Sequence, residues 1–124
     1  MKKGYIIKGN FNQKKMDHTT WYTLNYEKIL EIDTIERVRV SSVYPDTITD
    51  KFLCMLKNNS KLMPHLHVSI QTMDDKILHL MRRKYEADFV VKVLQKVQKE
   101  VPQVSLTADV IVGFPGETEE DFQD

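Results

Sequence analysis

Apolar residues recur with a period of two in several segments of the chain, and this pattern predicts strands. Residues 35–41 alternate apolar and charged side chains, and residues 66–70 form a second short apolar run. Residues 104–112 are a nearly continuous β-branched run, which is typical of a buried parallel strand. Residues 5–7 are compatible with one more short strand, whereas the rest of residues 1–22 shows no period and predicts a loop.

A spacing of three to four between apolar residues predicts helices in the intervening segments. The first helix lies around residues 24–32. The second follows the side-chain oxygens of residues 46–49, which can cap it, and ends near Leu62. The third carries the basic residues 82–84 in its last turn, where cations suit the helix dipole. The fourth spans about residues 87–100.

A strand, a glycine turn and a helix follow one another near the end of the chain. Asp109 lies near the end of the predicted strand, and Gly113 and Gly116 let the backbone approach a ligand closely. Thr118 and Asp121 have the spacing of a capping box, and the helix that they open adds free N–H groups. Ligands of parallel α/β folds bind beyond the carboxyl ends of strands. The spacing therefore fits a ligand site, and it fits a plain strand-to-helix turn equally well.

The predicted order is strand, helix, strand, helix, helix, strand, helix. Strands that alternate with helical crossovers predict an α/β fold with parallel strands, as an open sheet or part of a barrel. A weak boundary near residue 22 separates a poorly defined segment, residues 1–22, from a domain over residues 23–124.

Composition and charge narrow the class without pointing to a partner. The 124 residues are 41% hydrophobic and 29% charged, and 18 basic residues balance 18 acidic ones. These values are ordinary for a soluble globular domain and give no sign of nucleic-acid or membrane binding. With no signal peptide and no run of about 20 apolar residues, we expect a cytoplasmic protein. The single cysteine, Cys54, lies in an apolar run and is expected to be buried.

Three segments, in the same order, resemble motifs of the radical-SAM tRNA methylthiotransferases. Residues 107–118 resemble the family signature Asp-x-Ile-x-Gly-Phe-Pro-Gly-Glu-Thr. Residues 37–45 are similar to a strand that the family writes with Ser-Ser-x-Glu-Pro. Residues 64–71 and 75–85 resemble its His-x-x-x-Gln segment and its Met-x-Arg-x-Tyr helix. Within this family, the chain most resembles the enzymes that act on threonylcarbamoyladenosine in tRNA.

This resemblance implies a fold, a chemistry and a set of site residues. The fold would be part of an open TIM-like barrel, the radical-SAM barrel. The parent enzyme would use [4Fe–4S] clusters to cleave S-adenosylmethionine, abstract hydrogen from an adenine carbon of tRNA and insert a methylthio group. The wall of the S-adenosylmethionine pocket would then include Ser42, Gln71, Arg83, Asp109, Gly113 and Gly116.

The chain also departs from the family pattern. Tyr44 stands where the family has Glu, and Thr72-Met73 stands where it has Ser-Gly, although Met73 cannot replace a glycine that needs a positive φ. The family's cluster motif, Cys-x-x-x-Cys-x-x-Cys, is missing, and one cysteine cannot ligate a cluster. We therefore expect an internal piece of the domain, truncated at both ends, that has no catalytic residue of its own. Two alternatives stay open: a barrel half of another radical-SAM enzyme, and a non-catalytic remnant.

His65 and His67 lie two residues apart, so they face the same side of a strand. The pair is similar to the His-x-His metal site of amidohydrolase barrels, which is the alternative enzyme class. However, it lies at the start of the predicted strand, whereas barrel sites lie at the carboxyl ends. We therefore expect packing or hydrogen bonding at these histidines, and no metal.

Unpaired strand edges give a further expectation. A partial barrel leaves the backbone of its outer strands unpaired and uncovers an apolar inner face. Residues 104–112 carry only Asp109 as an interrupting charge, and the net charge is zero. We therefore expect the isolated chain to self-associate or to misfold.

Overall fold

The computed structural model describes residues 6–9 and 21–123, and it divides into two compact units, Met1–Val38 and Arg39–Asp124. In the first unit, β1 (Ile6–Gly9) pairs antiparallel with β2 (Trp21–Leu24). The short strand considered for residues 5–7 agrees with β1 at residues 6–7, whereas the loop predicted for the rest of residues 1–22 is wrong at residues 8–9 and 21–22. Residues 1–5 and 10–20 lie outside the described part. The predicted helix after Leu24 is confirmed as α1 (Tyr26–Leu30), where the Asn25 side chain accepts a hydrogen bond from the Lys28 amide at 3.2 Å.

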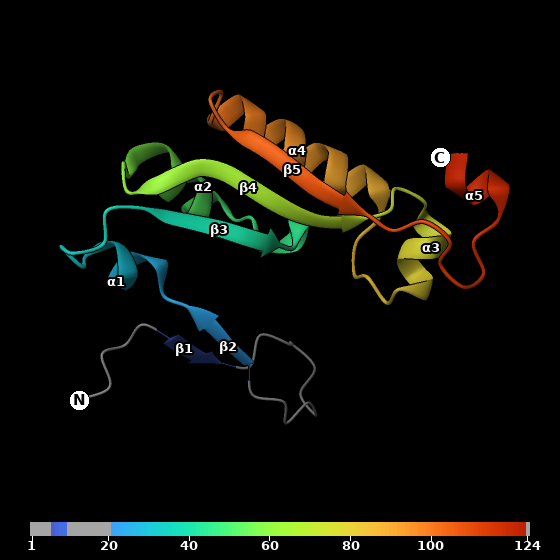
Figure 1. Ribbon diagram of the computed structural model, residues 1–124, viewed down its shortest axis with the longest axis horizontal. Helices are drawn as coiled ribbons and strands as arrows, with labels where there is room; N and C mark the ends of the chain where they lie inside the picture. Colours follow the sequence, from blue (N-terminus) through green and yellow to red (C-terminus); the bar gives the residue numbers. More distant parts are fainter. Residues whose placement is uncertain (1–5, 10–20, 124) are drawn as a thin grey trace. The chain divides into compact units, whose positions relative to one another are not determined.

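The second unit is an α/β layer in which the predicted order of elements is confirmed (Figure 1). Three strands form one sheet in the order β3-β4-β5; β4 and β5 pair in parallel, and all three arrows point the same way. The elements are β3 (Val38–Val43), the short 3-10 helix η1 (Pro45–Thr47), α2 (Asp50–Asn58), β4 (Leu62–Gln71), α3 (Asp75–Leu80), α4 (Ala87–Glu100), β5 (Ser105–Val110) and α5 (Glu119–Gln123).

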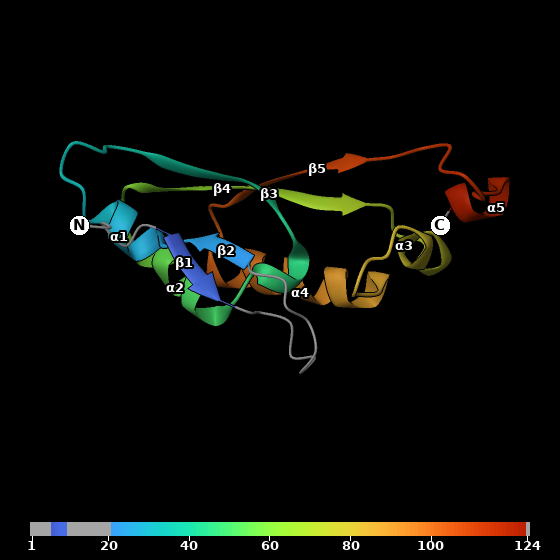
Figure 2. The ribbon, with the colours of Figure 1, turned by 90° about the horizontal axis from the view of Figure 1, so that it is seen from below.

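The core lies between the sheet and the helices α2 and α4, which cover one of its faces (Figure 2). Leu66 and Val68 of β4 are 0% and 1% exposed, and Val90 and Val97 of α4 are both 0% exposed. The buried residues are two apart on the strand and seven apart on the helix. This spacing explains the apolar period seen in each segment of the sequence. Leu62 belongs to this core as the first residue of β4, so its predicted place at a helix end is wrong.

Side-chain caps set where the helices begin. The hydroxyl of Thr49 accepts from the Phe52 amide at 3.2 Å, which confirms the predicted cap of α2. A carboxylate oxygen of Asp74 caps α3 by accepting from the Ile77 amide at 2.7 Å. The bounds predicted for the fourth helix are confirmed by α4. Its first amide, on Ala87, donates to Asp75 across 12 residues at 2.7 Å.

Two local predictions are wrong. Cys54 is exposed, because α2 buries Phe52, Leu53 and Leu56 and turns the cysteine outward. The basic residues 82–84 follow α3 instead of lying in its last turn, since the helix ends at Leu80 and Arg82 has a φ of 56°. Among the described helices, none is long and apolar enough to cross a membrane.

The burial expected for residues 104–112 is also absent. β5 lies at the edge of the described sheet and pairs only with β4, so it is not the central strand. Its residues are exposed except Leu106, which is half-buried, and Val110 and Val112 are 70% and 63% exposed. A β-branched run thus predicts a strand, but it does not predict whether other elements bury that strand.

Candidate functional site

The carboxyl ends of the three strands form one edge of the sheet, and the backbone turns left-handed on or just beyond each of them. Ser42 in β3 has a φ of 55°, Gln71 at the end of β4 has a φ of 75°, and Gly113 after β5 has a φ of 78°. Non-glycine residues in this region cost about 1–3 kcal/mol and concentrate at functional sites. This edge is therefore the candidate site, in the position that parallel sheets use for ligands.

A β-bulge precedes Gln71. Between Val68 and Gln71, β4 takes three steps, while β5 takes only two from Ala108 to Val110, so β4 carries one extra residue here. Just beyond it, the Ile111 amide donates to the Gln71 carbonyl at 2.8 Å. The chain that leaves β5 is thereby held against the end of β4.

The glycine turn after β5 satisfies its own N–H groups. Gly113 and Phe114 both donate their amides to one oxygen of Glu117, at 2.9 Å for Phe114. The predicted capping box is confirmed: the Thr118 amide donates to Asp121 at 2.7 Å, and the Asp121 amide donates to the Thr118 hydroxyl at 3.3 Å. The N–H groups of these four residues are therefore occupied within the turn and are not free donors for a ligand.

An ion pair ties this turn to α3. Lys76 contacts Asp121 at 2.6 Å, and the Asp121 side chain is only 12% exposed. The hydrogen bond from Lys76, followed by those from Thr118, lowers the pKa of Asp121, and the same bond raises the pKa of Lys76. Because the folded pKa of Asp121 lies below its unfolded value of about 3.9, its contribution to stability is present above that pH and is lost on further acidification.

We expect Asp121→Asn to make the chain less sensitive to acid. The variant loses the ion pair at neutral pH, so the difference in unfolding free energy from the parent should shrink as the pH falls below about 4. Urea unfolding at pH 7 and pH 3 measures this difference. Asp88→Asn is the matched control, because Asp88 forms an exposed pair with Lys92 on α4 at 3.7 Å. A constant difference at both pH values would contradict the prediction.

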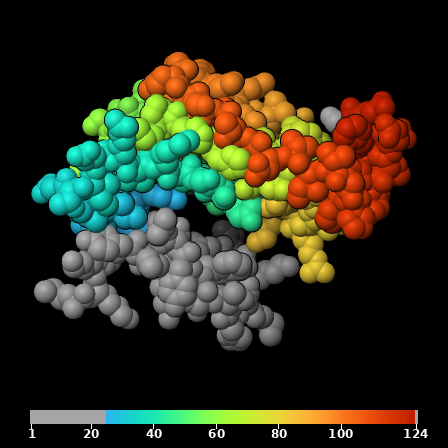
Figure 3. Space-filling view, in the orientation of Figure 1, coloured from blue at the N-terminus to red at the C-terminus, as the bar shows by residue number. Residues whose placement is uncertain are grey.

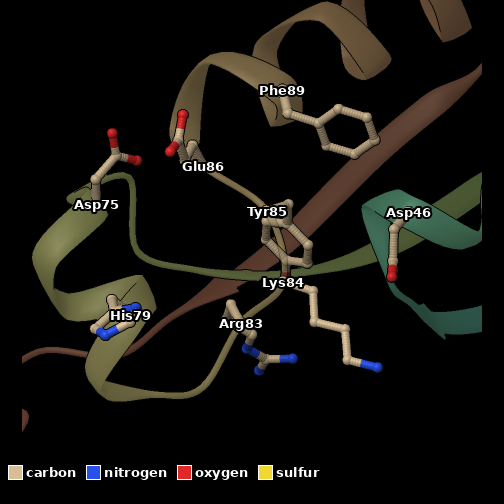
Figure 4. A pocket seen from close by; sticks show the side chains of 8 residues that line it. All are labelled: Asp46, Asp75, His79, Arg83, Lys84, Tyr85, Glu86 and Phe89. Carbon is tan, nitrogen blue, oxygen red and sulfur yellow. The ribbon is translucent and has the colours of Figure 1, made fainter. Parts of the chain in front are cut away.

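Arg83 lies in the loop after α3, beside a hollow of about 510 Å³ (Figure 4). Its guanidinium lies over the ring of Tyr44, 4.9 Å from the ring centre, so the residue at the family's Glu position forms a cation–π contact. Within the described residues, its buried Nε atom has no hydrogen-bond partner. Tyr85 fixes the loop by donating to the Ser69 carbonyl at 3.1 Å. Arg83 thus has an unused donor beside the edge.

The departure from the family pattern at residues 72–73 disturbs the turn after β4 less than the sequence suggests. Thr72 is 7% exposed, and its hydroxyl accepts from the Asp74 amide at 3.2 Å. Met73 packs against the cluster of Leu78, Tyr85 and Val90. Among the described residues, the left-handed position of this turn is Gln71, so Met73 needs no positive φ.

The two predicted histidines are hydrogen-bonded, as expected. His67 contacts the Thr107 hydroxyl with Nδ1 and an oxygen of Asp109 with Nε2, each at 3.0 Å. His65 lies 3.5 Å from the same hydroxyl through Nε2. No group of three or more His, Cys, Asp or Glu side chains in the described part of the chain could hold a metal ion. Cys54 lies on α2, in a hollow between α2 and α4.

Comparisons with known proteins place the chain in a family. The model of the radical SAM superfamily matches residues 16–124. The chain belongs to the radical SAM superfamily. Its relatives include tRNA-2-methylthio-N(6)-dimethylallyladenosine synthases from Thermobifida fusca, 45% identical over 92 residues, and from Endomicrobium trichonymphae, 36% identical over 119 residues. A third is the threonylcarbamoyladenosine tRNA methylthiotransferase of Bacillus subtilis, 43% identical over 105 residues.

These alignments cover 74%, 96% and 81% of this radical SAM chain, but only 19%, 28% and 23% of the three relatives. The predicted likeness to tRNA methylthiotransferases is confirmed, and the α/β layer of parallel strands agrees with part of a radical SAM barrel. The relatives differ in the modified adenosine that their names carry, dimethylallyladenosine in two of them and threonylcarbamoyladenosine in the third.

Sequence reasoning missed part of this site. Nothing in the residue types of Ser42 or Gln71 signals a positive φ, and Thr107 and Glu117 carry contacts that were not predicted. The alternation along β4 and β5 shows that His67, Thr107 and Asp109 can share a face of the sheet, but not which of them lie opposite one another.

Proposed function

We propose that this chain belongs to the radical SAM domain of an enzyme that adds a methylthio group to a modified adenosine in tRNA. The observation that carries the proposal is the edge of left-handed residues on three neighbouring strands, in a chain whose relatives are tRNA methylthiotransferases. Because tRNA is the proposed partner, the place of action would be the cytoplasm. The branch acting on threonylcarbamoyladenosine remains our preferred assignment.

In this proposal the edge forms one wall of the S-adenosylmethionine pocket. Arg83, with its unused buried donor, would bind the carboxylate of the ligand, and Gln71 and Ser42 would offer polar side chains from the strand ends. Gly113 and Gly116 would let the backbone lie close to the ligand, and Asp109 would accept a hydrogen bond from it. S-adenosylmethionine itself would supply the radical chemistry and the methyl group.

The test is a chimera of the Bacillus subtilis relative in which this chain replaces the matching segment. We expect the chimera to restore the methylthio form of threonylcarbamoyladenosine in a strain that lacks the enzyme, as detected by mass spectrometry of digested tRNA. A chimera that purifies with its iron and sulfide content intact but forms no methylthiolated nucleoside would overturn the proposal. A second chimera carries only residues 35–85 of this chain. Comparing the two chimeras separates a loss of activity caused by misfolding from one caused by missing site residues.

A [4Fe–4S] cluster does not fit the residues of this chain. The single thiol lies on α2, exposed, in the hollow shared with α4. A cluster needs three protein thiolates to leave one iron open. We expect anaerobic reconstitution with iron and sulfide to give no visible absorbance band in the 124-residue chain. A stoichiometric cluster would contradict this, unless Cys54→Ser abolishes it and so reveals a cluster bridged between chains.

We also propose that the chain self-associates through β5. Val110, Ile111 and Val112 are 70%, 43% and 63% exposed at an edge with no second neighbour among the described strands, and the net charge is zero. We expect the average mass in sedimentation to rise with concentration, and Val110→Lys to suppress the rise. Gln103→Lys is the control, because it adds the same charge outside β5. A concentration-independent monomer would contradict self-association.

A further inference from the structure

The face of the sheet that α2 and α4 leave uncovered is polar, although an apolar one was expected. On β4 the buried residues Leu66 and Val68 face the helices, so their neighbours His65 and His67 face the other side. β5 adds Thr107 and Asp109 there. Figure 3 shows the three strands side by side at the surface. Interiors of packed barrels are dominated by bulky branched residues, so polar side chains on this face are not there to fill a core.

These polar side chains form one hydrogen-bonded chain across two strands. His67 is paired in register with Thr107, and its ring bridges Thr107 and Asp109 through its two nitrogens, at 3.0 Å each. Both ring nitrogens of His67 are therefore used inside the protein, so the imidazole has one fixed orientation. Its side chain is 24% exposed, whereas that of Asp109 is 75% exposed.

Asp109 is held by one oxygen only. Oδ2 contacts His67, while Oδ1 has no hydrogen-bond partner among the described residues. A carboxylate fixed by one oxygen presents the other at a defined place, and a fixed acceptor binds a donor with less loss of rotamer entropy. An acceptor that carries a negative charge makes the stronger kind of hydrogen bond with an N–H or O–H group.

We propose that His67 is a positioning residue that holds Asp109 for recognition of an adenine nucleoside, whose exocyclic N–H or ribose hydroxyls donate to Oδ1. The proposal rests on the proposed function, in which each of the two reactants, S-adenosylmethionine and tRNA, contains an adenosine. His67 touches no ligand itself. It acts by orienting the carboxylate, and Thr107 fixes the histidine in turn.

The experiment uses the whole chain and two adenosine probes, S-adenosylhomocysteine and the free nucleoside N6-threonylcarbamoyladenosine. Binding is followed through amide chemical shifts of β4 and β5 in two-dimensional NMR. We expect Asp109→Asn to weaken binding of the recognised probe about tenfold, as loss of a charged acceptor implies. His67→Phe should weaken it to a similar extent, because the carboxylate loses the contact that fixes its position. The probe that responds identifies whether the adenosine belongs to the cofactor or to the substrate.

Three comparisons separate positioning from mere stability. The double variant should bind no more weakly than Asp109→Asn alone, because both changes remove the same contact. His67→Gln should restore most of the affinity, since its amide can donate to Asp109 where Nε2 did. Asp88→Asn on α4, outside this face, should bind like the parent chain.

Additive losses in the double variant, or unchanged binding by His67→Phe, would overturn the proposal. So would failure of the parent chain to bind either probe. Failure of the chimera to methylthiolate tRNA would instead reject the proposed function and leave these binding results standing, so the two outcomes are distinguishable.

Discussion

Replacing Leu66 with alanine is expected to lower the free energy of unfolding by about 2–5 kcal/mol, the usual range for a buried leucine. Leu66 is 0% exposed, in the middle of β4, the central strand of the described sheet, and it lies on the face that α2 and α4 cover. Truncation removes apolar contacts and leaves a cavity that neighbours on a hydrogen-bonded strand cannot close easily.

Urea unfolding followed by circular dichroism measures this change. Leu80→Ala is the matched control, because the same atoms are removed from a leucine that is 47% exposed at the end of α3. The control should cost well under half as much as Leu66→Ala. Equal losses at the two positions would show that the core does not lie between β4 and the helices.

Replacing Gly116 with valine is expected to cost about 1–3 kcal/mol and to distort the turn after β5. Gly116 has a φ of 95°, which a β-branched side chain does not adopt without strain. A Cβ atom there would also lie 3.4 Å from the Leu80 side chain. The backbone must therefore move, and the hydrogen bonds from Gly113 and Phe114 to Glu117 should weaken with it.

Amide chemical shifts of residues 113–118 and urea unfolding report the two effects separately. Gly113→Val is the informative comparison, since a Cβ there meets nothing within 4 Å but the φ of 78° is equally unfavourable. Similar costs at both glycines would assign the penalty to backbone strain alone. A Gly116 variant as stable as the parent chain, with an unchanged spectrum at this turn, would contradict the positive φ.

Periodicity predicted the elements well where one face of an element is buried. The stripe of Val90 and Val97 predicted α4 together with its bounds, because a helix that packs along its whole length keeps the spacing throughout. Thr49 and the pair Thr118 and Asp121 were also predictable, since capping acts between near neighbours in the sequence.

Features that depend on the register between strands could not be predicted. The contact of His67 with Asp109 joins residues 42 apart, and it exists only because β4 and β5 pair in one particular register. The burial predicted for β5 and for Cys54 was wrong for a related reason. The patterns of β5 and of Cys54 describe what the local chain favours, whereas burial depends on what other elements cover.

The extra residue between Val68 and Gln71 has a consequence for how the length of this segment can vary. Because the bulge absorbs the extra residue, Gln71 still pairs with Val110, and deleting one residue there would regularise the ladder and remove the irregularity that precedes the left-handed backbone at Gln71. An insertion there would add a second unpaired residue and enlarge the distortion. Insertions and deletions between His67 and Gln71 should therefore be tolerated far less than at the tips of loops. The number of residues in this stretch is itself a structural requirement, even where the residue types can be substituted.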